Sequence, residues 1–549
     1  MSRDPLPSSQ ALVPQPSRRW ALVLALPLVT GLIFSVAFKG PGNPGQAADS
    51  IPQNLPPAPE LDGGVAWLNT DQPIHLKDLR GKVVLLDFWT YCCINCLHTL
   101  PDLAKLEEKY PNQLVIIGVH SGKFDEEHNS DNIRKAILRY QISHPVVNDA
   151  QMKIWDAYGV SSWPTLCLID PEGHYLGQAH GEGNFDLLDR AIGRVIDIAR
   201  KNGTLNEKPI RFDLARYHER GDGALYFPGK VLADAASGRL FIADSTHHRI
   251  VITDLEGKKI AIAGTGLPGA VNGPFPKAQF NDPQGLALDG DTLYVADRRN
   301  HLIRALDLKA QTVRTVAGTG EQERENRDQG GPALKTGLNS PWDLCLHGRT
   351  LYIAMAGHHQ VWTLNLAGDM LAPFAGNGVE NIVDGPLSSA SFAQPSGLTT
   401  DGTNLYVADS EVSGIRSLPL NGQGEVKTIV GMGLFKFGDV DGVGDQVRLQ
   451  HPLGVAFQAG KLYVADTYNS KIKVIDPDKR SCTALAASAS GAQAQPLFRE
   501  PGGLSAAGDH LYVADTNAHR IRVVDLKTLK VVTLPLEGVS APASFVKSK

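Results

Sequence analysis

Hydrophobic positions along the 549-residue chain follow three different patterns in succession. An uncharged run covers residues 20–38, and strand-like and helix-like segments alternate from about residue 61 to 203. After that, short strand-like segments recur at intervals of about 50 residues. The three patterns predict a membrane-spanning helix, an α/β domain and an all-β repeat domain.

The uncharged run indicates a membrane anchor, because it is long enough to cross a bilayer as a helix. Arg18 and Arg19 precede it and Lys39 closes it. The distribution of positive charge therefore predicts a cytoplasmic tail over residues 1–18, an anchor over residues 19–39 and an exported remainder. The alternative is a cleaved signal peptide, but the run exceeds the usual length of a signal core, so we favour a retained anchor.

The α/β domain is predicted over residues 61–203, after a stiff Pro/Gly-rich linker over residues 40–60. It begins with a strand over residues 83–88 and a helix over 94–109. Apolar runs predict further strands over 114–119, 146–147, 166–169 and 175–179, and helices over 130–140, 152–158 and 185–200. Strands that alternate with helices indicate an α/β sandwich.

The repeats are predicted over residues 204–540, with a C-terminal tail over 541–549. Six segments share the pattern Leu/Phe–Tyr/Phe–Val/Ile–Ala–Asp, and they end at Asp244, Asp297, Met355, Asp409, Asp466 and Asp515. In the last five, a proline lies 14 residues before the end of the segment: Pro283, Pro341, Pro395, Pro452 and Pro501. Matching internal offsets at this period predict a four-stranded blade repeated six times, and thus a closed six-bladed propeller.

Charge and cysteine usage narrow the classes of function. The net charge is −5 and no basic block stands out, so the sequence predicts no nucleic-acid partner. Three of the six cysteines cluster at residues 92, 93 and 96 and the others are scattered. This pattern indicates a redox site in an ordinary folded protein rather than a disulfide-stapled scaffold.

The cysteine cluster lies where a strand turns sharply into a helix. At the first turn of a helix, unpaired N–H groups and the helix dipole favour a thiolate, so Cys93 is the candidate nucleophile. Cys96, one turn later, can close a disulfide and release a bound partner. A fixed disulfide, or two thiols without turnover, is the structural alternative. A metal site that adds Cys92 and His98 is disfavoured, because no second Cys or His pair lies at zinc spacing.

The same residues resemble known proteins. Asp87-Phe88-Trp89 ahead of Cys93-x-x-Cys96 resembles thioredoxin, and residues 78–84 resemble membrane-anchored thioredoxins of the TlpA type. The sharper resemblance is that of Tyr91-Cys92-Cys93-Ile94-Asn95-Cys96, together with Asn300-His301-Leu302. It links roughly residues 60–540 to the family of NHL repeat-containing protein 2 and its bacterial and plant relatives.

The resemblance implies roles for residues around the cysteines. Asp87 matches the buried aspartate that passes protons to the resolving cysteine, and Pro164 after Trp163 matches a cis-proline that faces the disulfide. A half-exposed strand-end aspartate and an ordinary trans-proline are the alternatives. The candidate catalytic residues are thus Cys93, Cys96, Asp87 and Pro164. The candidate substrate-groove residues are Trp89, Tyr91, Cys92, Trp163 and Thr165.

Apparent sites in the repeats are better explained as turns. His248, His301, His359 and His519 each lie four residues after the end of a blade segment, so they occupy equivalent turns rather than one metal site. Asp439-Val440-Asp441-Gly442 resembles part of a calcium loop. However, Asn272-Gly273 and Asp384-Gly385 lie at the same offset before a blade proline, which favours a turn. Met355, in place of aspartate, marks either drift or a binding surface, and we favour drift.

We therefore expect a membrane-tethered thiol–disulfide oxidoreductase without a cofactor. The expected partners are a protein client that carries a disulfide or thiol and a second protein bound by the propeller. The expected compartment is the periplasm or the thylakoid lumen. The alternative is a non-catalytic scaffold in which the propeller binds partners and the thioredoxin-like domain is a redox sensor or a vestige.

Overall fold

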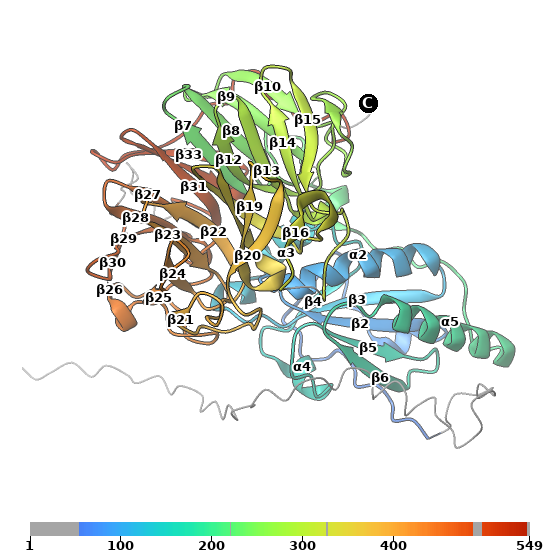
Figure 1. The fold of residues 1–549 in the computed structure, drawn as a ribbon. Coiled ribbons are helices and arrows are strands. Elements are labelled where there is room, and N and C mark those ends of the chain that lie inside the picture. Colours follow the sequence, from blue (N-terminus) through green and yellow to red (C-terminus); the bar gives the residue numbers. More distant parts are fainter. Residues whose placement is uncertain (1–53, 220, 326–327, 487–496, 546–549) are drawn as a thin grey trace, which may run out of the picture.

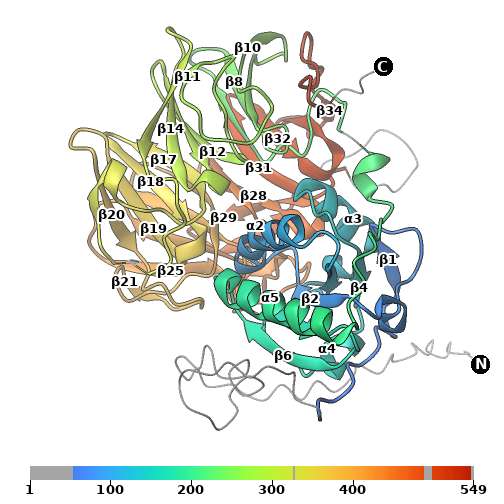
Figure 2. The same cartoon turned by 90° about the vertical axis from the view of Figure 1, so that its right-hand side faces the viewer.

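The computed structural model describes residues 54–219, 221–325, 328–486 and 497–545. An α/β domain lies against one face of a propeller, and helices α2 and α3 are on the side nearest to it (Figures 1 and 2). Within the described ranges, no helix combines the length and apolar character needed to cross a membrane. The predicted span over residues 20–38 lies outside these ranges.

The α/β domain is built on one six-stranded sheet with the strand order β1-β4-β3-β2-β5-β6. β2, β3 and β4 are parallel, and the other three strands run antiparallel to their neighbours. The strands are β1 (Ala66–Leu68), β2 (Val83–Trp89), β3 (Leu114–His120), β4 (Val146–Asn148), β5 (Thr165–Ile169) and β6 (Tyr175–His180). Because β2 and β3 are buried on both faces, their apolar runs are continuous rather than alternating.

Helices cover both faces of the sheet. They are α2 (Ile94–Lys109), α3 (Ser130–Arg139), α4 (Lys153–Ala157) and α5 (Phe185–Asn202), with short 3₁₀ turns η1 (Leu76–Leu79) and η2 (Asp125–His128). Alternate residues of β2 belong to two cores: Leu85 packs with α2 and α5, and Leu86 packs with α4. α5 ends at Gly203, whose positive φ of 72° allows the chain to turn out of the helix.

The propeller has six blades, as the repeat pattern predicted. The first blade comprises β7 (Lys230–Asp234), β8 (Arg239–Asp244), β9 (Arg249–Asp254) and β10 (Lys259–Ala263), and the second β12 (Pro283–Asp289), β13 (Thr292–Asp297), β14 (Leu302–Asp307) and β15 (Thr312–Ala317). The third comprises β17 (Pro341–His347), β18 (Thr350–Met355), β19 (Gln360–Asn365) and β20 (Met370–Ala375), and the fourth β22 (Pro395–Thr400), β23 (Asn404–Asp409), β24 (Gly414–Pro419) and β25 (Glu425–Val430). The fifth comprises β27 (Gly454–Gln458), β28 (Lys461–Asp466), β29 (Lys471–Asp476) and β30 (Ser481–Ala484), and the sixth β31 (Pro501–Ala507), β32 (His510–Asp515), β33 (Arg520–Asp525) and β34 (Val531–Thr533).

Four of the blades carry an additional two-residue strand on their outer edge. These strands are β11 (Gly273–Pro274), β16 (Gly331–Pro332), β21 (Gly385–Pro386) and β26 (Gly442–Val443). They include the Gly residues of the predicted turns. Asp441, beside β26, pairs with Lys473 at 2.7 Å and accepts a hydrogen bond from the backbone N–H of Ala484. The loop at residues 439–442, which resembles part of a calcium loop, therefore has hydrogen-bonding and ionic partners within its own blade.

The recurring aspartate anchors the start of its blade. One carboxylate oxygen of each accepts a hydrogen bond from the backbone N–H of the residue two positions before the blade proline, which is Pro228 in the first blade. The pairs are Asp244 with Tyr226, Asp297 with Asn281, Asp409 with Ala393, Asp466 with Gln450 and Asp515 with Arg499. In the third blade, the sulfur of Met355 accepts the equivalent N–H of Asn339 at 3.3 Å. Met355 thus keeps the same position in the blade.

The recurring histidines also link neighbouring blades. Each has a positive φ near 50°, and its Nδ1 accepts the backbone N–H of the residue that precedes the inner strand or proline of the next blade. The acceptor–donor pairs are His248 with Asp282, His301 with Ser340, His359 with Gln394 and His519 with Phe227. The last pair joins the sixth blade to the first. Residues 210–214 form no strand, so the ring closes through such contacts and the packing of β31 on β7.

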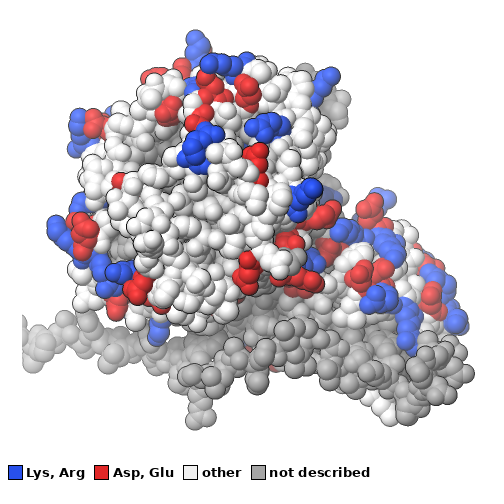
Figure 3. Space-filling view, viewed as in Figure 1, with Lys and Arg blue, Asp and Glu red and all other residues white. Residues whose placement is uncertain are grey.

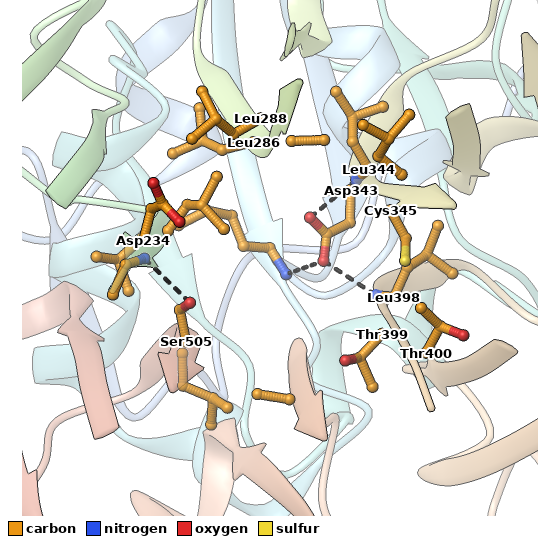
Figure 4. Close-up of a pocket in the computed structure, with 18 of the residues that line it drawn as sticks. Asp234, Leu286, Leu288, Asp343, Leu344, Cys345, Leu398, Thr399, Thr400 and Ser505 are labelled. Carbon is orange, nitrogen blue, oxygen red and sulfur yellow. Dashed lines mark hydrogen bonds and ion pairs between the residues drawn. The ribbon is translucent and has the colours of Figure 1, made fainter. Parts of the chain in front are cut away.

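The six inner strands surround a cavity of about 670 Å³, and Figure 4 shows residues that line it. The lining includes residues of the turns after β7 and β12, at the ends of these strands that lie away from the α/β domain. The Lys230 ammonium lies at the floor of the cavity, where it donates to the carbonyl oxygens of Ser396 at 2.7 Å and Leu453 at 2.5 Å. It also pairs with Asp343 at 3.3 Å. Burial lowers the pKa of Lys230 and raises that of Asp343. This one side chain connects four blades across the axis.

The folded domains extend slightly beyond the predicted boundaries. In the predicted linker, Pro57 forms a β-bridge with His174, and Glu60 accepts the backbone N–H groups of Leu76 and Lys77. In the predicted tail, the ring of Phe545 packs on His247 at 4.6 Å. On the face shown in Figure 3, acidic and basic side chains lie interspersed.

Candidate functional site

The candidate nucleophile lies at the N-terminus of α2. Cys93 is the N-cap residue, with extended backbone angles (φ −77°, ψ 115°), and its Sγ accepts the backbone N–H of Cys96 at 3.4 Å. A sulfur in this position meets the donors that the first turn of a helix leaves unpaired. All six cysteines are free thiols, so this geometry belongs to the reduced form.

The two thiols differ in access. Cys93 is partly exposed, whereas Cys96 is fully buried against the core beneath α2. Burial raises the pKa of the Cys96 thiol well above its usual value, and the neighbouring Cys93 adds to the shift. An external disulfide can therefore meet Cys93 first, and Cys96 needs a base before it can attack.

Asp87 is placed to be that base. It lies on β2 with no exposed surface, and burial raises the pKa of its carboxyl group to about 7. Neither carboxyl oxygen has a hydrogen-bond partner within the described ranges. The charge of Asp87 also contributes to the raised pKa of Cys96, after burial and Cys93. A carboxyl group with a pKa near neutrality can exchange protons with a thiol at working pH.

The loop opposite the cysteines carries the predicted proline. The Trp163-Pro164 peptide bond is cis. Trp163 is partly buried; its ring lies 4.6 Å from that of Trp155 at an interplanar angle of 44°, and its Nε1–H donates to Ser121 O at 2.9 Å. Thr165 is fully buried at the start of β5. Cys93 and Trp163 both pack against the same hydrophobic core.

Three of the predicted groove residues lie in a different setting from the one predicted. Trp89, Tyr91 and Cys92 are each at most 1% exposed, and propeller residues contact Tyr91 and Cys92. The Tyr91 ring stacks on His120 at 5.4 Å, and the Tyr91 hydroxyl reaches into the propeller. In this arrangement they line no open groove, and their contact with a client stays a prediction.

One repeat position contributes contacts to the α/β domain from five of the six blades. It is the residue immediately before each blade proline, or its equivalent, and all six have a positive φ: Phe227, Asp282, Ser340, Gln394, His451 and Glu500. We call these the pre-proline residues. Five of the six touch the α/β domain. The contacts are Phe227 with Arg139, Ser340 with His98, Gln394 with Cys92 and Ile94, His451 with Phe124, and Glu500 with Tyr91 and Arg139.

Further polar contacts surround the cysteine loop. Lys123 forms an ion pair with Glu411 of the fourth blade, and both side chains are buried. Glu127 accepts the backbone N–H of Cys92 at 2.9 Å, and burial raises its pKa to about 7. His98 bonds to both Glu182 and Ser340 at 2.5 and 2.7 Å. The last two contacts account for His98 without a metal.

The sequence analysis did not find Gln394, Glu411 or Glu500. A signal existed, because the pre-proline residue differs in every blade although the flanking proline and aspartate recur. Variation at a fixed place in a repeat indicates a role outside the fold of the repeat itself.

Family models and known proteins match both domains. A thioredoxin-like model matches residues 81–175, and an NHL repeat model matches residues 280–306, 449–475 and 498–524. The thiol-disulfide oxidoreductase YkuV of Bacillus subtilis is 26% identical over 141 residues, which is 26% of this chain and 94% of that protein. The α/β domain is thus related to thiol–disulfide oxidoreductases.

Longer matches cover both domains together. NHL repeat-containing protein 2 of Homo sapiens is 43% identical over 477 residues, or 81% of this chain. The chloroplastic protein SUPPRESSOR OF QUENCHING 1 of Arabidopsis thaliana is 42% identical over 454 residues, or 79% of this chain. The chain spans 65% of the length of the human protein and 43% of the plant protein. The predicted resemblance is confirmed, and the chain belongs to the NHL repeat-containing protein 2 family, with which it shares a thioredoxin-like domain followed by an NHL-repeat propeller.

Proposed function

We propose that the chain is a thiol–disulfide oxidoreductase that acts on protein disulfides, with the propeller recruiting a protein partner. The observation that carries the proposal is the asymmetry at α2: Cys93 is partly exposed at the helix N-terminus, and Cys96 is buried one turn behind it. This arrangement separates an attacking thiol from a resolving thiol.

In the reducing direction, the Cys93 thiolate attacks one sulfur of a client disulfide. The S–S bond of the client breaks, its other sulfur leaves as a thiolate, and Cys93 is joined to the client. Asp87 then accepts the Cys96 proton, and Cys96 attacks the Cys93 sulfur, which releases the client as a dithiol. The enzyme is left oxidised, as the Cys93–Cys96 disulfide, because its two electrons have passed to the client dithiol. A protein dithiol must reduce it before the next cycle, and the reverse sequence oxidises a client.

The proposal includes a membrane tether through residues 19–39, with the main domains in the periplasm or the thylakoid lumen. Support comes from the uncharged run and from the positive residues before it. Protease treatment of sealed membrane vesicles tests the topology. A tethered, exported protein sediments with the membrane and is digested only from the exported side, whereas a protein that washes off with carbonate contradicts the tether.

Reduction of a model protein disulfide tests the activity. The full chain with a dithiol donor is expected to reduce insulin faster than Cys93→Ser does, and a Cys345→Ser variant serves as the matched control because Cys345 lies in the propeller cavity. Equal rates for wild type and Cys93→Ser contradict the proposal.

One observation favours a second function. The propeller buries Tyr91 and Cys92 beside the nucleophile, which suits a scaffold whose thioredoxin-like domain senses redox state without turnover. In that case, a partner binds the propeller with an affinity that depends on whether Cys93 and Cys96 are oxidised, and the Cys93→Ser variant binds it like the reduced wild type. A pull-down under oxidising and reducing conditions distinguishes the two functions.

A further inference from the structure

The fourth blade of the propeller makes two hydrogen bonds to the loop that carries Cys93. Gln394 Oε1 accepts the backbone N–H of Ile94 at 2.8 Å, and Gln394 Nε2 donates to the backbone oxygen of Cys92 at 3.0 Å. One carboxamide therefore bonds to the residues on both sides of the nucleophile. We propose that Gln394 is a positioning residue of the redox site and that the site is built by both domains. This inference rests on the proposed function.

Gln394 is itself held firmly in this orientation. Its side chain is fully buried, and its backbone has a φ of 62°. Its own N–H donates to His359 Nδ1 at 3.1 Å, which fixes the backbone through the turn of the preceding blade. Because both ends of the residue are bonded, the carboxamide has little freedom to follow the loop. The loop must instead fit the carboxamide.

The α/β domain holds the other side of the same loop. Tyr91 N–H donates to His120 Nε2 at 3.3 Å, and Cys92 N–H donates to Glu127 Oε1 at 2.9 Å. The N–H groups of Tyr91 and Cys92 are thus bonded to the α/β domain, whereas the Cys92 carbonyl and the Ile94 N–H are bonded to the propeller. Loss of the Gln394 contacts would leave the Cys92 carbonyl and the Ile94 N–H buried without a partner.

The contact bears directly on the chemistry of Cys93. Ile94 is the first residue of α2, and its N–H is one of the donors that a helix start leaves unpaired. With this N–H bonded to Gln394, the Cys93 sulfur faces the next available donor, Cys96 N–H. The carboxamide is neutral, so it fixes the loop without placing a negative charge beside a thiolate. A carboxylate in its place would oppose the thiolate.

The contact also limits how a client can approach. A carboxamide offers the same donor and acceptor as a backbone peptide group, so Gln394 occupies the Cys92–Ile94 edge as an extended peptide would. A client therefore meets Cys93 from the side of the proline loop, where Trp163 is partly exposed and Pro164 is buried. This favours an extended client segment that lies along the proline loop.

The test compares three variants of the full chain, without a client. Gln394→Glu keeps the shape and an acceptor for Ile94 N–H but adds a charge, and Gln394→Leu keeps the bulk but loses both bonds. Gln450→Leu is the matched control, because Gln450 also binds the α/β domain through a backbone N–H, that of Glu126 at 3.2 Å, whereas its contacts do not include residues 92–96. The readouts are the pH profile of Cys93 alkylation by iodoacetamide and the reduction potential of the Cys93–Cys96 pair in glutathione buffers.

For Gln394→Glu, we expect alkylation of Cys93 at neutral pH to slow at least threefold and the midpoint of the profile to move to higher pH. The reduction potential should become more negative, because the reduced form loses stability relative to the disulfide. Gln394→Leu should also change the potential, and Gln450→Leu should match wild type in both readouts.

Folded Gln394 variants with the alkylation profile and potential of wild type would overturn the inference. If Gln394→Leu unfolds, Gln394→Glu decides alone, with its folding checked by thermal unfolding against Gln450→Leu. The two readouts need no client. A wild type that reduces no protein disulfide therefore contradicts the proposed function while the Gln394 variants still test the inference.

Discussion

The Tyr91 hydroxyl donates a hydrogen bond of 3.1 Å to the carboxylate of Glu500, a residue 409 positions further along the chain. The other carboxylate oxygen of Glu500 pairs with Arg139 of α3 at 3.1 Å. The sixth blade thereby binds both the cysteine loop and a helix of the α/β domain. All three side chains are largely buried, so the energy of these contacts is little screened by solvent.

Removal of the Glu500 carboxylate should destabilise the protein strongly. Glu500→Ala leaves the Arg139 guanidinium buried without its partner, which typically costs about 3–5 kcal/mol. Tyr91→Phe removes a single hydrogen bond and should cost only about 1 kcal/mol. Urea unfolding monitored by tryptophan fluorescence measures both free energies. Similar losses for the two variants would mean that the ion pair contributes no more than the phenol.

Asp87 should make the resolving step depend on pH. Its pKa of about 7 implies that release of a mixed disulfide accelerates as pH rises through 7, because the carboxylate is the base. Asp87→Asn should slow this step and remove that dependence. Stopped-flow measurement of mixed-disulfide release from pH 5 to 9 tests this. The exposed Asp156 provides the control variant Asp156→Asn.

Asp87 should also affect stability, with the opposite sign from most carboxyl groups. Its pKa is higher in the folded chain than the value of about 3.9 in an unfolded one, so the folded state binds the proton more tightly. The contribution of Asp87 to the free energy of unfolding falls as pH rises from about 4 to 7 and is constant above that range. Asp87→Asn has no buried carboxylate to ionise, so its free energy of unfolding at pH 8 should exceed that of wild type by about 2–4 kcal/mol. Equal unfolding free energies at pH 8 contradict this.

The two cysteines of the motif should differ in reactivity. Cys93 is partly exposed, whereas burial excludes reagents from Cys96 and raises the pKa of its thiol. Iodoacetamide at neutral pH should therefore label Cys93 at least about tenfold faster in the folded protein. Mass spectrometry of digested samples measures both rates. Denaturant should abolish the difference, and equal labelling in the folded state would show that Cys96 is accessible.

Lys230 should stabilise the propeller by connecting its blades. Lys230→Met leaves Asp343 buried without its ion pair and should cost about 3–5 kcal/mol. A double variant, Lys230→Met with Asp343→Leu, should recover most of that loss, because no unpaired charge remains. Thermal unfolding compares the variants. Cys93 alkylation should not change in either, since the turns that line the cavity lie at the strand ends away from the α/β domain.

The sequence predicted the elements that arise from local patterns. The helix expected over residues 94–109 is α2 with the same bounds, and the strand expected over 83–88 is β2, one residue longer. Both follow from apolar periodicity next to a turn. The six blades follow from repetition, since the aspartate performs the same local task in five blades and Met355 takes its place in the third.

The sequence could not predict the contacts between the domains. Gln394 and Ile94 lie 300 positions apart, and no periodic pattern connects them. A comparison of repeats also emphasises what the blades share, whereas docking depends on the residues in which they differ. The same limit explains Tyr91 and Cys92. Near the thioredoxin-like motif they suggested an open groove, and their burial depends on a domain more than 130 residues away.

The pre-proline residue differs from blade to blade, so each blade offers a different side chain to the α/β domain. All six share one backbone conformation, so exchanging two blades, duplicating one or permuting the ring would leave a propeller that still closes. Such a rearranged ring would present glutamine in place of serine, or phenylalanine in place of glutamate, and the α/β domain would lose its contacts with these residues. Docking of the α/β domain therefore depends on the order of the blades, whereas closure of the propeller does not.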